Sequence, residues 1–298
     1  MRVLVTGAGG QLGRSLVRLA SARGHEVAPF TRTALDVTDG TAVSAVLAEQ
    51  RPHWTLHTAA ATKVDLCESE VAWAEAVNAT APGIVAKACR AAGSGMLHYS
   101  TDFVFDGGKG EPYVETDPIA PLSVYGRTKA EGERAVQEAG LERWLLVRTQ
   151  WVYGPGGPCF PTAILDKARA GEPLRVVEDQ RGSPTMTDDL ANATLDLIDA
   201  AQSGVAAWGI YHAANRGVMS WFDFAKLIVT TAGVDAEIAA ISSDELALPA
   251  RRPAYSALDT TKLEVAIARP LPSVVDGLIR FLEAGGLTGY NASARRGM

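Results

Sequence analysis

Cysteine and histidine are both scarce in this chain of 298 residues. The three cysteines (Cys67, Cys89 and Cys159) are odd in number and show no paired spacing, so we expect free thiols in a reducing compartment. The five histidines form no close pair of the kind that binds zinc. The sequence therefore predicts neither disulfides nor a metal site.

Long apolar runs and an excess of positive charge are also missing. No apolar stretch approaches the roughly 20 residues of a membrane-spanning helix, and the first strand-like run begins almost at Met1, which leaves no room for a signal peptide. The formal net charge of −6 argues against a basic nucleic-acid-binding surface. We therefore expect a cytoplasmic protein that binds neither membranes nor nucleic acid.

The first half of the chain alternates short apolar runs with amphipathic stretches. This alternation predicts a Rossmann-like, doubly wound α/β fold, in which helices cover both faces of a parallel sheet. Strands are expected near residues 3–5, 26–30, 54–58, 96–100 and 144–149, and helices near residues 11–23, 40–50, 68–92 and 125–137.

The alternation loosens after residue 154. We expect residues 1–154 to form the Rossmann domain, with further core elements from later segments, and residues 155–284 to form mainly a smaller α/β lobe for the substrate. The polar, glycine-rich residues 285–298 are expected to be a flexible tail. In the second half, helices are expected near residues 162–170, 188–201, 221–232 and 273–284, and strands near 174–177 and 209–212.

Three glycines, Gly7, Gly10 and Gly13, lie directly after the first expected strand and open the first expected helix. Gly7 can adopt the positive φ of a tight turn, Gly10 lets the backbone approach a phosphate, and Gly13 lets the helix pack closely on the strand. Backbone N–H groups and the helix dipole can then hold a pyrophosphate. We interpret the motif as a dinucleotide-binding turn, with a plain tight turn as the alternative.

The end of the second expected strand indicates which dinucleotide binds. A carboxylate there would favour the ribose 2′-OH of NAD, whereas a cation would favour the 2′-phosphate of NADP. The sequence has Arg32 there and no carboxylate until Asp36. We therefore expect NADPH, with Arg32 as the partner of the 2′-phosphate, although use of NADH and a merely solvated Arg32 both stay open.

Tyr125 alone among the seven tyrosines has a lysine, Lys129, four residues later. On a helix the two side chains lie on one face. The Lys129 ammonium is expected to lower the phenol pKa from about 10, so that Tyr125 can protonate the oxygen of a ketone that receives a hydride. Thr101, at the end of the fourth expected strand, can hydrogen-bond that carbonyl. A surface contact between tyrosine and lysine is the alternative.

Together these motifs resemble the extended short-chain dehydrogenase/reductases and, among them, the dTDP-4-dehydrorhamnose reductase family, over nearly the whole chain. Other segments that carry the resemblance are Ala59-Ala60-Ala61-Thr62, His98-Tyr99-Ser100-Thr101-Asp102-Phe103, Trp151-Val152-Tyr153-Gly154, Gly182-Ser183-Pro184-Thr185, Ser220-Trp221 and Arg252-Pro253.

The resemblance implies NADPH-dependent reduction of the 4-keto group of dTDP-4-dehydro-β-L-rhamnose to dTDP-β-L-rhamnose. Thr101 and Asp102 would contact the sugar, and Trp151 would wall its pocket. The cofactor contacts implied by the resemblance are Gly10, Gln11 and Leu12 at the pyrophosphate, Asp36 and Val37 beside the adenine, and Ala60, Ala61, Thr62 and Tyr99 on the nicotinamide side.

Two positions depart from the family pattern. Ser15 stands on the first helix where members that dimerise through magnesium carry an acidic residue, so we expect no required metal and leave the choice between monomer and homodimer open. Phe103 stands where tyrosine is common and where related 4,6-dehydratases carry a glutamate. Because Phe103 cannot act as an acid or a base, we do not expect dehydration.

Two other functions stay open. A 4-ketoreductase for another nucleotide-linked deoxysugar would share the reacting centre and differ only in the shape of its pocket. A non-catalytic regulatory subunit, like that of methionine adenosyltransferase, would share the family resemblance and act by binding a partner. The intact set of Thr101, Tyr125 and Lys129 favours an enzyme.

Overall fold

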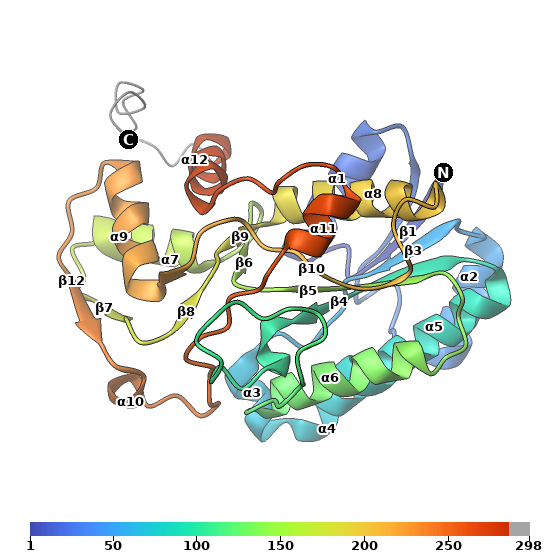
Figure 1. Ribbon diagram of the computed structural model, residues 1–298, viewed down its shortest axis with the longest axis horizontal. Helices are drawn as coiled ribbons and strands as arrows, with labels where there is room; N and C mark the ends of the chain where they lie inside the picture. The colour runs from blue at the N-terminus through green and yellow to red at the C-terminus, as the bar shows by residue number, and fades with distance from the viewer. Residues whose placement is uncertain (286–298) are drawn as a thin grey trace.

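A six-stranded parallel sheet forms the centre of the protein (Figure 1), whose computed structural model describes residues 1–285. The strand order is β2-β1-β3-β4-β5-β10, so the order reverses beside β1, where open α/β sheets bind ligands. Strand β10 (Gly209–His212) comes from the second half of the chain and extends the sheet beside β5. The other strands are β1 (Arg2–Thr6), β2 (Glu26–Phe30), β3 (Trp54–His57), β4 (Gly95–Thr101) and β5 (Trp144–Thr149).

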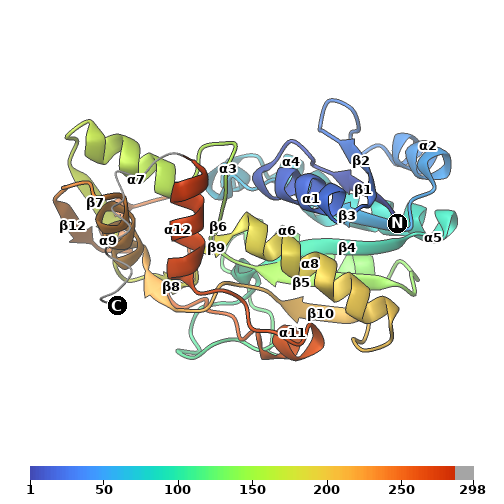
Figure 2. The same cartoon turned by 90° about the horizontal axis from the view of Figure 1, so that it is seen from above.

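Helices cover both faces of this sheet (Figures 1 and 2). One face carries α1 (Gln11–Ala22) and α8 (Thr187–Gln202), and the other carries α2 (Gly40–Gln50), α5 (Ala81–Ala92) and α6 (Val124–Gln137). Apolar side chains are buried on both sides, which explains the nearly continuous apolar strands. Among the residues that the structure describes, no helix is long and apolar enough to cross a membrane.

The stretch predicted as one helix over residues 68–92 is divided. It comprises α3 (Val64–Ser69), α4 (Val71–Ala74), a π-helical turn η1 (Glu75–Thr80) and α5. The first break is at Glu70, whose φ of −107° and ψ of 55° are not helical. In the wide turn, the side chain of buried Asn78 exchanges two hydrogen bonds with the backbone of Ala61, at 2.8 and 3.0 Å. The prediction of a single helix was wrong, because the spacing of apolar residues does not reveal a π-helical turn.

The later residues form a smaller lobe beside the sheet. Its core lies among α7 (Phe160–Arg169), α9 (Trp221–Ala232) and α12 (Val274–Ala284), with the parallel pair β7 (Leu174–Val177) and β12 (Ile238–Ile241). The tail predicted over 285–298 lies, from residue 286 onward, outside the described residues. The shorter elements are η2 (Asp102–Val104), β6 (Val152–Tyr153), β8 (Arg181–Gly182), β9 (Thr185–Met186), β11 (Met219–Ser220), α10 (Ser243–Leu246) and α11 (Thr261–Ala266).

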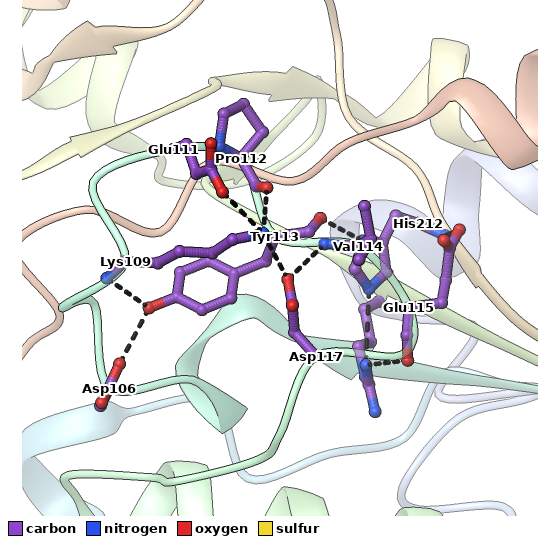
Figure 3. Close-up of polar contacts among 10 residues, drawn as sticks. Asp106, Lys109, Glu111, Pro112, Tyr113, Val114, Glu115, Asp117 and His212 are labelled. Atoms are coloured by element: carbon purple, nitrogen blue, oxygen red, sulfur yellow. Dashed lines mark hydrogen bonds and ion pairs between the residues drawn. The ribbon is translucent and has the colours of Figure 1, made fainter.

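The loop of residues 106–117, which we call the strap, runs past the outer edge of β10 (Figure 3). Within the strap, the Tyr113 hydroxyl donates to Asp106 at 2.8 Å, and Lys109 pairs with Asp117 at 2.8 Å. The backbone N–H of His212 on β10 donates to Glu115 at 3.0 Å, and Nδ1 of His212 contacts the Tyr113 carbonyl at 3.0 Å. The strap is therefore fastened both to itself and to the edge of the sheet.

Candidate active site

A cleft of about 1040 Å³ crosses the carboxyl ends of the sheet strands. At one end it is bordered by the glycine turn and by Arg32, and at the other by Trp151 and by Trp221 of the smaller lobe. Most of the residues predicted from the sequence to bind cofactor or substrate line this one cleft. They are Gly7, Gly10, Gln11, Leu12, Gly13, Arg32, Asp36, Val37, Ala60, Thr62, Tyr99, Thr101, Asp102, Tyr125, Lys129 and Trp151.

The glycine turn leaves room for a bound group because glycine has no side chain. Gly7 has φ +67°, and a Cβ there would lie 2.7 Å from the backbone nitrogen of Ala59. A Cβ on Gly13 would collide with the Gly7 carbonyl, so these glycines also let α1 approach β1 and β3. Helix α1 starts after Gly10 without a side-chain cap and without acidic residues in its first turn. Its first N–H groups therefore suit a pyrophosphate.

Arg14, which was not predicted from the sequence, adds positive charge beside this turn. Its Nε donates to the Gly9 carbonyl at 2.9 Å, and its guanidinium reaches the carbonyl of Gly156 in the loop that follows β6. Gln11 donates to the Pro158 carbonyl of the same loop at 2.7 Å. The position of Arg14, one residue after the last motif glycine, is the feature of the sequence that points to it.

The end of the cleft beside β2 contains Arg32, Asp36 and Val37. Asp36 accepts hydrogen bonds from the backbone N–H and the hydroxyl of Thr38, at 2.9 and 2.7 Å. These bonds, with a smaller contribution from the charge of Arg32, hold the pKa of the Asp36 carboxyl below its ordinary value. Arg32 is exposed, so its guanidinium can meet a phosphate that enters from solvent.

Two of the residues predicted to face the nicotinamide are largely engaged by the core. Ala61 is fully buried and does not line the cleft, because its backbone is engaged by Asn78. The Tyr99 hydroxyl is hydrogen-bonded to Thr194 of α8 at 2.7 Å, so its ring belongs to the core between the sheet and α8. The Tyr99 carbonyl, by contrast, accepts from Lys129. Ala60 and Thr62 line the cleft as expected.

Tyr125 and Lys129 lie one turn apart at the start of α6. The helix begins there because the Ser123 side chain accepts from the N–H of Gly126, at 3.1 Å. The Tyr125 hydroxyl is hydrogen-bonded to that of Thr101, and Thr101 Oγ1 donates to Asp102 Oδ1 at 2.9 Å. The Phe103 ring packs edge-on against the Tyr125 ring at 5.4 Å. These contacts fix the phenol at the end of β4.

The charges in this part of the cleft differ from the sequence-based expectation. Removal from water raises the pKa of Tyr125 well above its ordinary value, and the nearby Asp102 carboxylate adds to the rise. Burial lowers the pKa of Lys129 to about 8 and raises that of Asp102 to about 6. The expectation that Lys129 lowers the Tyr125 pKa was wrong, because the ammonium is directed at the Tyr99 carbonyl, 2.6 Å away.

The end of the cleft nearest the smaller lobe is lined by a parallel pair of indoles. Trp151 and Trp221 stack with centroids 3.7 Å apart and planes 8° apart. Trp151 has φ +46°, a left-handed backbone that non-glycine residues adopt rarely, and this turn directs its ring to the lobe. Trp221 lies 70 residues later in the chain, so only the folded lobe brings the two together. The sequence analysis had placed Trp221 in a family segment without a role.

Several buried polar atoms behind this wall have no hydrogen-bond partner among the described residues. They belong to side chains that line the cleft at the ends of strands β4 and β5: Ser100 Oγ, Thr149 Oγ1 and both amide atoms of Gln150. Buried polar atoms are normally satisfied, so this cluster suits a ligand rich in hydroxyl groups or ordered water. Arg252, which also lines the cleft, pairs with Asp65 at 2.8 Å.

Ser15, the position at which magnesium-linked members carry an acid, lies inside the molecule. It is 2% exposed and donates to Thr187 of α8 at 2.8 Å. Within residues 1–285, no group of three or more His, Cys, Asp or Glu side chains is arranged to hold a metal ion.

Comparison with known proteins places these features in one family. The model of the RmlD substrate-binding domain matches residues 1–285. The dTDP-4-dehydrorhamnose reductase of Streptomyces griseus is 45% identical over 271 residues, which cover 91% of this chain and 89% of that protein. A probable dTDP-4,6-dihydroxy-2-methyloxan-3-one 4-ketoreductase of Streptomyces antibioticus is 42% identical over 260 residues, covering 87% of this chain and 86% of that protein.

A solved structure extends the similarity to three dimensions. The crystal structure of dTDP-4-dehydrorhamnose reductase from Bacillus anthracis, in complex with NADP, is 36% identical and superimposes with a TM-score of 0.90. The match covers 95% of this chain and 99% of that one. The chain therefore belongs to the RmlD family of dTDP-4-dehydrorhamnose reductases, within the extended short-chain dehydrogenase/reductases.

Proposed function

We propose that this protein uses NADPH to reduce the 4-keto group of dTDP-4-dehydro-β-L-rhamnose, giving dTDP-β-L-rhamnose. The observation that supports this most directly is the hydrogen-bonded set of Tyr125, Thr101 and Asp102, with Lys129 one turn away, in a cleft that also contains a glycine turn. Family membership supports the same reaction.

The glycine turn and the start of α1 would hold the cofactor pyrophosphate, with Arg14 beside it. Arg32 would meet the 2′-phosphate, which favours NADPH over NADH. Lys129, in the wall of the cleft, would donate a hydrogen bond to a ribose hydroxyl of the cofactor. When bound, NADPH supplies the hydride that reduces the carbonyl carbon of the sugar.

Tyr125 is the acid in this proposal. Its raised pKa keeps the phenol protonated at neutral pH, so a proton is available when negative charge develops on the sugar oxygen. The Thr101 hydroxyl is hydrogen-bonded to the phenol and also donates to Asp102 Oδ1, so it would hold the phenol in place. The ammonium of Lys129, which donates to the Tyr99 carbonyl, would act on the cofactor ribose and not on the phenol.

The substrate would lie across the rest of the cleft. Asp102 and the unpartnered groups near it would receive sugar hydroxyls, and Trp151 with Trp221 would form an apolar wall. Residues 155–284 would serve mainly as the substrate lobe and residues 1–154 as the cofactor domain. We further propose a cytoplasmic location and a monomer or homodimer.

A second candidate is 4-keto reduction of another dTDP-linked deoxysugar. The 42% identity to the Streptomyces antibioticus protein, whose name specifies a different dTDP-4-ketosugar, supports this second candidate. The reacting groups would be the same, and the discrimination would come from the shape of the pocket.

The test is oxidation of NADPH by the purified protein with each of the two dTDP-4-ketosugars, with the product stereochemistry read by NMR. We expect a higher kcat/KM for dTDP-4-dehydro-β-L-rhamnose. A preference for the other sugar would establish the second candidate. If neither sugar is turned over, the enzyme assignment fails, and a non-catalytic partner-binding role would have to replace it.

A further inference from the structure

On the side of the sheet, the Lys129 ammonium contacts only neutral groups. Its Nζ donates to the Tyr99 carbonyl at 2.6 Å and lies 3.5 Å from Nε2 of His98, the outer limit of a hydrogen bond. His98 is 1% exposed on β4, and His57 on β3 stacks against it with ring centroids 5.2 Å apart. The buried pair of imidazoles therefore forms the floor beneath the ammonium.

The number of donors gives this arrangement a geometric consequence. An ammonium group has three N–H donors. Tyr99 and His98 occupy the directions toward the sheet, so the remaining donor of Lys129 is left for the cleft that the side chain lines. A single acceptor would leave the group free to turn about its own axis, whereas two acceptors define its orientation.

The nearest carboxylate on the same helix does not compete for the ammonium. Glu133 is one turn further along α6, and both of its oxygens are bound by Arg148, at 2.9 and 2.7 Å. A direct ion pair would neutralise the charge of Lys129, whereas a carbonyl and an imidazole leave it available to the reacting groups.

We propose that His98 is a positioning residue for Lys129: with the Tyr99 carbonyl, it orients the ammonium toward the cofactor ribose in the cleft. This inference rests on the proposed function for its effect on turnover. Its effect on NADPH binding can be measured without any sugar substrate.

The sign of the pH effect depends on every charged or titratable group near Lys129. His98 is buried and stays neutral, and an acceptor for the ammonium favours its charged form. Loss of that acceptor should shift deprotonation of Lys129 to lower pH. The groups that act on Lys129 are His98 and Tyr99 from β4, His57 from β3, Glu133 from α6, and Arg148 from β5 through Glu133. Tyr125 of α6 and Asp102 of η2 line the same cleft.

The test compares His98→Leu, which removes the acceptor, with His98→Gln, whose amide oxygen reaches about as far. His212→Leu is the matched control, because His212 is equally buried but lies beside Arg148. We expect His98→Leu to lower kcat about threefold to tenfold and to move the alkaline fall of kcat and of NADPH affinity down by about half to one pH unit. His98→Gln should recover most of both, and His212→Leu should lower the melting temperature only.

An unshifted pH dependence of NADPH binding in folded His98→Leu would overturn the positioning role, whatever the sugar. An equal shift in His212→Leu would also overturn it, because a general loss of rigidity would then explain the result. If the native protein turns over no dTDP-4-ketosugar but the binding shift is seen, the proposed function fails and this inference stands.

Discussion

Glu133 of α6 and Arg148 of β5 form a two-point ion pair inside the protein. The Nε–Oε1 distance is 2.9 Å, the Nη2–Oε2 distance is 2.7 Å, and the side chains are 1% and 2% exposed. Arg148 also lies over the Phe105 ring, 5.2 Å from its centroid. The pair thus connects the helix that carries Tyr125 and Lys129 to the sheet.

Removal of one partner should be much more damaging than removal of both. Arg148→Met would leave the Glu133 carboxylate buried without its partner, and we expect a loss of about 3–5 kcal/mol in the free energy of unfolding. The double variant Glu133→Leu/Arg148→Met should regain most of this loss. Urea denaturation of the three proteins measures both effects. Additive losses in the double variant would show that the two groups act independently.

Tyr125→Phe removes the acid and keeps the ring that packs against Phe103. We expect kcat to fall about 10²- to 10⁴-fold, because the sugar oxygen must then take its proton from water. NADPH affinity should change little. Steady-state kinetics and a fluorescence titration with NADPH separate the two effects, and near-native turnover would assign the acid elsewhere.

The raised pKa of Asp102 gives stability a defined pH dependence. Its pKa rises from 3.8 to about 6 on folding, so the folded state favours the protonated carboxyl and loses stability as the pH increases through about 6. Asp102→Asn removes this ionisation. We expect the variant to be more stable than the native protein by about 2–3 kcal/mol near pH 7.5 and by little below pH 4. The midpoints of urea denaturation of both proteins across this pH range test the prediction. A difference in stability between them that does not vary with pH would contradict it.

Arg32→Ala tests the choice of cofactor. Without the guanidinium the 2′-phosphate loses its cation, so kcat/KM for NADPH should fall about tenfold while that for NADH changes little. Arg14→Ala is the control. Because Arg14 borders the glycine turn, its loss should weaken the binding of both cofactors equally. An unchanged ratio of the two cofactors in Arg32→Ala would exclude this role.

Local patterns in the sequence predict the sheet and the glycine turn well, because each depends on neighbouring residues. The apolar run at residues 3–5 and the glycines after it specify β1 and the start of α1 without reference to the rest of the chain. The lysine four residues after Tyr125 likewise needs only one helix turn to reach the same cleft.

Features that depend on tertiary contacts could not be predicted in this way. The π turn that places Asn78 against Ala61, and the stacking of Trp151 on Trp221, both join distant segments. The direction of the Lys129 ammonium was missed for the same reason. Its partners lie 30 and 31 residues earlier in the chain, on β4, and spacing within one helix says nothing about them.

The strap has a consequence for how the protein behaves at high concentration. A sheet edge with free N–H and carbonyl groups is a template for strand pairing with another molecule. At β10, Glu115 accepts a hydrogen bond from the N–H of His212, and Lys262 donates one to the carbonyl of Ile210. At the opposite edge, β2 contains Pro29, which has no N–H group. Cleavage of the strap by a protease would therefore free the N–H of His212 for strand pairing, while Lys262 would still cover the carbonyl of Ile210.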